Sequence, residues 1–196
     1  MKPLRTIAAL LASTLASCAS TSVKDQWKDP AWHGTPAANV VVVGIARSDT
    51  TRRIFEDTFA ADLEKVGVRA EQSYTQIEPG EGGGVKLSDF VRSSNADAVL
   101  TTRVQRVEQR VNVSSNYYAP IGYRGFYGWY GTAWAATPTV SQYEIVTLET
   151  TVWDPRTEKL IWAATTQRVA SQDIPKVTTQ LAQTLIPRMK SDGIIR

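Results

Sequence analysis

The stretch NVVVVGIA at residues 39–46 decides the fold of this 196-residue chain. A continuous run of β-branched residues is typical of a strand that is buried on both faces, as in the centre of an α/β sheet. Ser48 or Asp49 can cap a helix directly after this strand, and Gly67 supplies a stop for that helix. Four apolar residues at helical spacing mark the buried face of the helix: Phe55, Phe59, Leu63 and Val66.

A second strand and a second helix follow in the same order. Residues 68–77 predict the strand, and residues 79–84 (PGEGGG) predict a flexible loop. A short helix is expected around residues 87–94, with Phe90 and Val91 facing inward. This alternation of strands and helices favours an α/β sandwich.

The second half of the chain predicts an antiparallel meander. Three long strands are expected at residues 98–113, 143–153 and 160–169, and a turn over residues 154–159 joins the last two. In the first of these strands the apolar residues switch from even to odd positions. Such a switch indicates a bulge or sharp twist near residues 105–107.

A final helix completes the predicted fold. Asp173 is placed to cap it, Pro175 fits its first turn, and Pro187 is expected to kink or shorten its end. Together these elements predict a single α/β (α+β) domain over residues 39–196. Its sheet is mixed, with about five strands, a long antiparallel meander in the second half, and two or three helices mainly on one face.

The N-terminus has the layout of a secretory signal that ends in a bacterial lipobox. Two basic residues precede an uncharged apolar run at residues 7–16, which is too short to cross a bilayer. The sequence Leu15-Ala16-Ser17-Cys18 then places the chain's only cysteine where lipoprotein processing requires a thiol. We expect residues 1–17 to be removed and Cys18 to be lipidated, and an ordinary cleaved signal peptide is the alternative.

Lipid on Cys18 makes a membrane the first expected partner. Ala19 follows the cysteine in place of an aspartate, so the sorting habits of Gram-negative lipoproteins imply the outer membrane, facing the periplasm. Residues 18–38 are expected to form a flexible tether, because they are small and polar and are interrupted by prolines and a glycine. Trp27 and Trp32 in this tether are expected to pack on the domain.

A Gly/Tyr-rich loop at residues 114–139 interrupts the meander and holds eight of the chain's 17 aromatic residues. Loops of this length are usually functional or disordered. Three interpretations stay open: the loop covers an exposed part of the sheet, contacts another protein, or contacts glycan or lipid head groups. The candidate binding residues are Tyr117, Tyr118, Tyr123, Arg124, Phe126, Tyr127, Trp129, Tyr130 and Trp134.

The sequence predicts no catalytic residue, no metal site and no cofactor. His33 is the only histidine and Cys18 the only cysteine, so Ser–His–Asp, Cys–His and His/Cys metal sites lack the residues they need. Residues 80–84 lack the Gly-Lys-Ser/Thr ending of a phosphate loop, and Gly44 lacks the partner glycines of a dinucleotide fingerprint. Removal of the signal lowers the net charge from +3 to +1, and no basic run favours nucleic-acid binding.

Several of these motifs together resemble a family of uncharacterised proteobacterial envelope lipoproteins. After the lipobox, the likeness lies in WKDP at residues 27–30, VVVVGI at residues 40–45, the Gly/Tyr-rich loop, and the hairpin VWDPRTEKLIW at residues 152–162. Glu158 holds a position in that hairpin that glycine more often takes. The resemblance implies an α/β domain similar to the TolB N-terminal type, and it implies no reaction and no catalytic residues.

From the residues and the resemblance, we expect a membrane-anchored lipoprotein without enzymatic activity. It would bind or scaffold another envelope protein, of unknown identity, through the aromatic loop and the sheet edge beside it. The alternative function is a module that binds peptidoglycan or another glycan by stacking on the same loop. A third hypothesis is a structural lipoprotein whose loop only shields the core.

Overall fold

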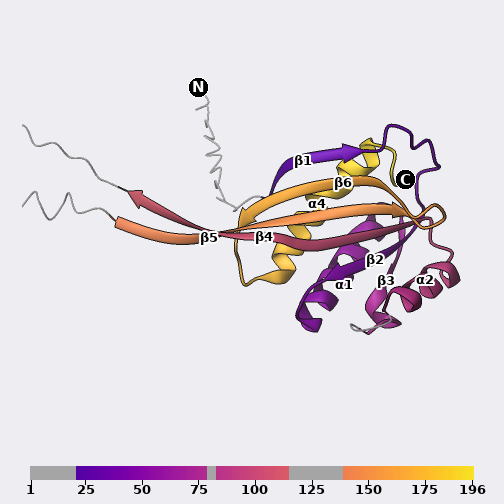
Figure 1. Cartoon of the computed structure of the whole chain (residues 1–196), viewed down its shortest axis with the longest axis horizontal. Coiled ribbons are helices and arrows are strands. Elements are labelled where there is room, and N and C mark those ends of the chain that lie inside the picture. Colours follow the sequence, from indigo (N-terminus) through magenta and orange to yellow (C-terminus); the bar gives the residue numbers. More distant parts are fainter. Residues whose placement is uncertain (1–20, 79–82, 115–138) are drawn as a thin grey trace, which may run out of the picture.

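The computed structural model describes residues 21–78, 83–114 and 139–196. These residues form a six-stranded mixed sheet with α-helices on both faces, in the strand order β1-β6-β5-β4-β2-β3 (Figure 1). The strands are β1 (Ser22–Lys28), β2 (Asn39–Ile45), β3 (Arg69–Gln72), β4 (Ala98–Ser114), β5 (Thr139–Asp154) and β6 (Lys159–Val169). The predicted fold class is confirmed, and β1 adds a sixth strand to the five expected.

The first half of the chain builds the parallel part of the sheet. β2 pairs in parallel with both β3 and β4. Parallel neighbours require crossover connections, which contain α1 (Asp49–Lys65) and α2 (Gly83–Ser93). The valines at positions 40, 41 and 42 are almost fully buried, as their continuous run predicts for a central strand.

The strand predicted at residues 68–77 is shorter than expected. β3 ends at Gln72, and Ser73–Thr75 form a 3₁₀ turn. The chain turns here because the Ser73 hydroxyl and the Tyr74 backbone N–H donate to the carboxylate of Glu56 in α1, at 2.8 and 2.9 Å. These bonds tie the turn to the helix in place of a longer strand.

β4, β5 and β6 form the predicted antiparallel meander, and β1 continues it at the edge of the sheet. The register between β4 and β5 shifts between Val104 and Arg106, which confirms the predicted bulge. The turn between β5 and β6 places Glu158 at a φ of +56°. Glycine adopts this conformation more readily than glutamate does, as the resemblance to related hairpins implies.

Two helices cover one face of the sheet and one covers the other. α1 and α4 (Ile174–Ser191) pack on what we call the front face, where the main core includes Phe59 and Leu181. α2 packs on the back face, against a small cluster that includes Val41 and Val99. The expectation of helices mainly on one face is therefore confirmed.

The predicted helix caps are present. Ser48 caps α1 and Asp173 caps α4, and each side chain accepts a hydrogen bond from the N–H three residues on. α4 continues past Pro187 and ends at Ser191, so the expected shortening of this helix is wrong. The buried residues Leu185 and Met189 on either side of the proline hold the last turn against the core. None of the described helices is long and apolar enough to cross a membrane.

The prediction that residues 18–38 form a flexible tether is wrong for Ser22–Lys28. These residues form β1, an edge strand that pairs antiparallel with β6. A polar sequence can form this strand because its backbone supplies the hydrogen bonds, while Val23 packs against the core. The side chains of Gln26 and Lys28 also donate hydrogen bonds of 2.6 Å to Asp192, at the end of α4.

The remainder of that segment meets the expectations in part. Trp32 packs against the core as predicted, whereas Trp27 is 45% exposed. Cys18 lies outside the described residues, and only residues 19–21 separate it from β1 in the sequence. The spacer between a lipid on Cys18 and the folded domain is therefore much shorter than predicted.

β4 and β5 run on beyond the rest of the sheet, toward the left of Figure 1. β2 stops pairing with β4 at Arg103, and β6 stops pairing with β5 at Ile145. Beyond these points, residues 106–114 of β4 pair only with β5, and residues 139–144 of β5 pair only with β4, among the described strands; we call these two segments the ribbon. Two strands alone are marginally stable in water, so the ribbon is the least supported part of the sheet.

Candidate binding cavity and apolar strip

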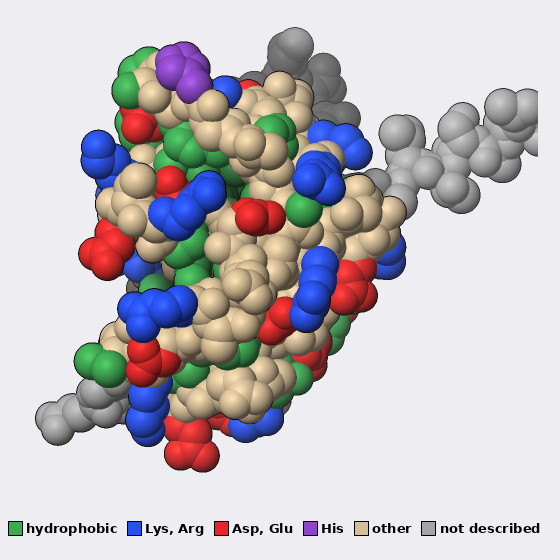
Figure 2. Space-filling view, turned by 90° about the vertical axis from the view of Figure 1, so that its right-hand side faces the viewer, with side chains coloured by type: hydrophobic (Ala, Val, Ile, Leu, Met, Phe, Trp, Pro, Cys, Tyr) green, Lys and Arg blue, Asp and Glu red, His purple; other side chains and the backbone are tan. Residues whose placement is uncertain are grey.

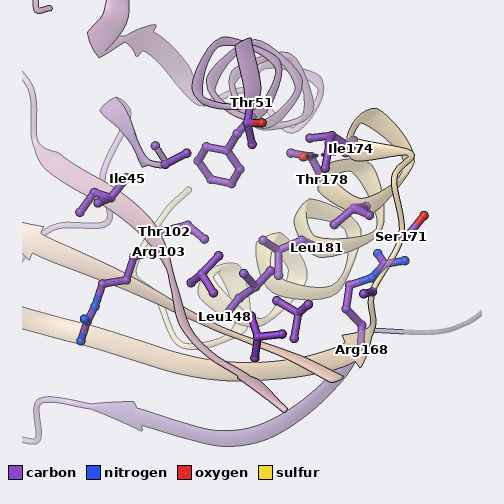
Figure 3. Close-up of a pocket in the computed structure, with 18 residues that line it drawn as sticks. Ile45, Thr51, Thr102, Arg103, Leu148, Arg168, Ser171, Ile174, Thr178 and Leu181 are labelled. Atoms are coloured by element: carbon purple, nitrogen blue, oxygen red, sulfur yellow. Dashed lines mark hydrogen bonds between the residues drawn. The ribbon is translucent and has the colours of Figure 1, made fainter. Parts of the chain in front are cut away.

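A cavity of about 260 Å³ lies between the front face of the sheet and the N-terminal ends of α1 and α4 (Figure 3). The surface that surrounds it is almost entirely apolar. Its volume lies between that of a cavity that holds benzene, about 150 Å³, and that of a site for a drug-sized ligand, about 300 Å³ or more. The apolar side chains that define its walls include Phe55, Val104, Val146, Leu148, Ile174 and Leu181.

Gly44, at the end of β2, allows α1 to approach the sheet beside the cavity. A Cβ atom at this position would lie 3.0 Å from Cδ1 of Phe55 and 3.4 Å from the backbone oxygen of Arg52. The N–H of Gly44 also donates a 2.8 Å hydrogen bond to Oε1 of Glu56. A side chain at this position would press on Phe55 and on the backbone of α1, so glycine allows α1 to pack close to the sheet with Phe55 in the cavity wall.

A buried polar network fixes this end of α1. The fully buried carboxylate of Glu56 accepts hydrogen bonds of 2.8–2.9 Å from Gly44 N–H, Arg52 Nε, Ser73 Oγ and Tyr74 N–H. Arg52 is also buried, and its Nη2 donates to Ser73 Oγ at 2.8 Å. Both charges are therefore compensated inside the protein, which is the condition under which a buried ion pair persists. The network supports the cavity wall from behind, because Arg52, Glu56 and Ser73 are not among the residues that line the cavity.

Arg168 brings a positive charge to the rim of the cavity. It lies on β6 opposite Val146 and is only 7% exposed. Its Nε donates to the backbone oxygen of Val169 at 3.2 Å, and its Nη1 donates to Oε1 of Gln180 at 3.1 Å. Both acceptors are neutral. The ion pairs found among the described residues do not include Arg168.

The surroundings of Arg168 change its pKa without removing its charge. Burial lowers the pKa of Arg168 from its ordinary value, and the negative charge of Asp173, at the start of α4, opposes this effect in part. An arginine stays protonated even so. The rim of the cavity thus presents a cation, and the planar guanidinium of an arginine is well suited to a carboxylate or a phosphate.

An apolar strip continues from the cavity along the front face of the ribbon. It consists of five valines that are each more than half exposed: Val104, Val107, Val111, Val113 and Val140. The first two line the cavity on either side of the bulge, and Val113 is the cross-strand partner of Val140. Gln109, Gln142 and Glu144 are exposed on the same face between these valines, so the strip is mainly but not wholly apolar. Exposed surface that is mainly apolar marks an interaction site more often than scattered apolar residues do.

The residues that the sequence singled out lie outside the described part of the chain. This holds for the expected lipidation site, Cys18, and for all nine candidate binding residues between Tyr117 and Trp134. Their arrangement is therefore not described, and their roles stay predictions. The cavity and the strip are a separate candidate site, built from the body of the sheet and from the ribbon.

The sequence does not reveal Arg168 or the strip, although each leaves a signal. Along β6, the front-face positions 162, 164 and 166 are buried, and Arg168 is the next residue on that face. A cation at an inward position is the signal for a site there. Along β4, valines at alternate positions predict a buried face, but no described helix reaches the ribbon to cover it.

The groups at this site are suited to binding. The described residues that line the cavity include no His, Cys, Asp, Glu or Lys. Across the described parts of the chain, no three such metal-ligating side chains (His, Cys, Asp or Glu) are grouped closely enough to hold a metal ion. His33, the only histidine of the chain, is exposed. What the cavity offers is mainly apolar contact, a few hydroxyl groups, and two guanidinium groups, of which that of Arg103 pairs with Glu149 and that of Arg168 has no ion pair among the described residues.

No protein-family model matches this sequence, and no curated protein matches it. Among solved structures, it resembles a variant PelC dodecamer from Paraburkholderia phytofirmans, with 18% identity, 89% of this chain and 99% of that chain covered, and a TM-score of 0.48. For the PelC dodecamer from the same organism, the identity is 18%, the alignment covers 90% of this chain and 99% of that chain, and the TM-score is 0.47. For lipoprotein GNA1162 from Neisseria meningitidis, the identity is 12%, the alignment covers 79% of this chain and 99% of that chain, and the TM-score is 0.41. These likenesses are too distant to carry a conclusion about function, and the TolB N-terminal resemblance stays a prediction.

Proposed function

We propose that this chain is a lipid-anchored, non-enzymatic binding protein of the bacterial envelope, and that its cavity holds an apolar and acidic segment of another envelope protein. The position of Arg168 at the rim of the cavity carries this proposal. A nearly buried cation beside apolar walls, with no acidic partner among the described residues, suits a ligand that brings both an apolar group and a carboxylate.

The size and the walls of the cavity favour a protein segment. At about 260 Å³ it is smaller than sites that enclose drug-sized ligands, and it has room for one or two side chains of a larger partner. Burial of those side chains against Phe55, Leu148 and Leu181 would contribute about 25 cal/mol per Å² of apolar surface removed from water. A neighbouring carboxylate would then form charge-assisted hydrogen bonds with Arg168.

The lipobox supports the location that we propose. We infer that Cys18 carries lipid and that Ala19 directs the protein to the periplasmic face of the outer membrane. Metabolic labelling with an alkyne fatty acid tests the first step, with Cys18→Ser as the control. Label on the native chain and none on the variant is the expected result, and an unlabelled native chain would contradict it.

Binding of peptidoglycan or another glycan is the second candidate function. It rests on the eight aromatic residues of the segment 114–139, because aromatic rings offer broad apolar faces on which a sugar can stack. The cavity does not favour this function, since its surface is almost entirely apolar and the many hydroxyls of a sugar each need a polar partner. Retention on isolated sacculi that is lost in Trp129→Ala and Tyr130→Ala would support it.

Photo-crosslinking in cells tests the function that we prefer. A benzophenone amino acid at position 104 lies at the cavity, whereas the same group at position 85 lies on α2, where Val85 is 69% exposed. We expect one discrete protein adduct from position 104 and none from position 85. The adduct should disappear when Arg168→Met is added. Adducts from both positions, or from neither, would contradict the proposal.

A further inference from the structure

β1 begins at the end of the sheet from which the ribbon extends. Ser22, the first residue of β1, pairs with Gln167 of β6, which pairs with Thr147 of β5, which in turn pairs with Arg106 of β4. These four residues form one row across the sheet, and the ribbon begins in that row. Neighbouring strands are about 4.8 Å apart, so Ser22 lies about 14–15 Å from the start of the ribbon.

Only a short sequence separates Cys18 from β1. The four residue steps from Cys18 to Ser22 span at most about 13–14 Å. β1 and β5 are both antiparallel to β6, so they run in the same direction, and Ser22 is at the end of β1 that is nearer to the tip of the ribbon. Residues 106–114 extend about 27 Å from the same row. The ribbon therefore reaches at least as far as Cys18 does.

The ribbon has two different faces. Its front face carries the apolar strip, in which Glu144 is the one charged residue and Gln109 and Gln142 are the other polar ones, and no described helix covers this face. Its back face carries Arg106 and Arg110, which both pair with Glu108, at 3.0 and 2.5 Å. Segments with one apolar face and one charged face are typical of elements that lie in the interface of a membrane.

The opposite end of the molecule presents a different surface. Figure 2 views that end directly, and there basic and acidic side chains are interspersed over the surface. α2 lies at this end, beside the turn between β5 and β6 (Figure 1). A mixed, charged surface of this kind is suited to water.

We propose that the ribbon docks on the membrane that holds Cys18, with the apolar strip at the boundary between lipid head groups and acyl chains. This inference rests on the lipidation of Cys18 proposed above. A lipid surface is the occupant that the geometry favours, because the short spacer keeps that surface within reach of the strip at a high effective concentration. The body of the domain then points its charged end away from the membrane.

Collisional quenching by spin-labelled lipids tests this orientation. The lipidated protein is reconstituted into vesicles of phosphatidylethanolamine and phosphatidylglycerol, with a fluorophore on one introduced cysteine. Val111→Cys and Val113→Cys place the probe on the strip, Asn112→Cys places it on the other face of the ribbon, and Val85→Cys places it on α2. Lipidated Cys18 does not react with the label, because its sulfur is part of a thioether.

We expect the probe to be quenched severalfold more at positions 111 and 113 than at positions 112 and 85. Weak and equal quenching at all four positions, in protein shown by mass spectrometry to carry lipid, would overturn the docking. That outcome would leave the proposed lipidation and the proposed role of the cavity intact. A mass without lipid would instead overturn the anchoring on which the docking rests.

Discussion

At the scale of single residues, Glu56 carries the largest share of the polar architecture beside the cavity. Glu56→Gln keeps the shape of the side chain but removes the negative charge, so the buried guanidinium of Arg52 loses its counter-ion. Breaking one side of a buried ion pair costs about 3–5 kcal/mol, and we expect a loss of that size in the free energy of unfolding. Urea denaturation measures it. Asp49→Asn, which removes an exposed partner of Arg53, is the control and should have little effect.

Arg168 separates binding from stability at the same scale. Arg168→Met keeps an extended side chain but removes a cation that has no acidic partner among the described residues. We therefore expect the free energy of unfolding to stay unchanged or to rise, while crosslinking from position 104 is lost. Arg103→Met is the matched control, because Arg103 also lines the cavity but pairs with Glu149 and is half exposed. A large loss of stability in Arg168→Met would show that this arginine is structural.

At the scale of elements, the turn between β5 and β6 contains one strained residue. Glu158 has a φ of +56°, where a side chain is unfavourable and glycine is not. Glu158→Gly should therefore raise the free energy of unfolding by up to about 1 kcal/mol, measured by urea denaturation. Glu158→Ala retains the Cβ atom and should give no such gain. Equal effects of the two substitutions would show that the backbone of the turn is not under strain.

The edge strand β1 is held by the end of α4. The carboxylate of Asp192 accepts hydrogen bonds from Trp162 Nε1 at 2.8 Å and from Gln26 Nε2 at 2.6 Å. Asp192→Ala leaves the indole N–H of the buried Trp162 without its acceptor, which costs about 1–3 kcal/mol. We expect hydrogen exchange across β1 to become faster, as measured by mass spectrometry. Asp25→Asn, on the exposed side of β1, is the control and should leave the exchange unchanged. Fast exchange across β1 in the native protein would contradict the pairing of β1 with β6.

The sequence predicts those elements whose signals are local. α1 was expected with both of its ends, because Ser48, Gly67 and the spacing of its apolar residues coincide. The bulge in β4 was expected because the pattern of its valines changes parity there. β1 carries no such pattern, because its sequence is polar. Its partner strand, β6, is also far along the chain, so that Ser22 pairs with Gln167. Only the folded sheet shows that this segment has a partner.

At the scale of the whole molecule, the candidate site depends on contacts that a sequence pattern does not contain. The cavity collects side chains from four strands and two helices, and Arg168 belongs to it only because β6 lies beside β5. The exposure of the strip has the same origin, because it depends on where α1 and α4 end relative to β4. Cys18 could be singled out from the lipobox motif, and the aromatic segment from its composition. They lie outside the described residues and stay predictions.

The length of the spacer determines how the whole domain meets the membrane, and this can be changed without touching the fold. A flexible Gly/Ser insertion of about twelve residues after Thr21 lengthens the path from Cys18 to β1 from four residue steps to about sixteen. The effective concentration of the membrane at the ribbon then falls about eightfold, if it follows the −3/2 power of spacer length. Quenching at position 111 should fall toward that at position 85, while the free energy of unfolding stays unchanged. Replacing residues 19–21 without lengthening the spacer is the control and should retain the quenching. Full quenching with the long spacer would mean that the ribbon finds the membrane by its own affinity, and that the anchor does not orient the domain.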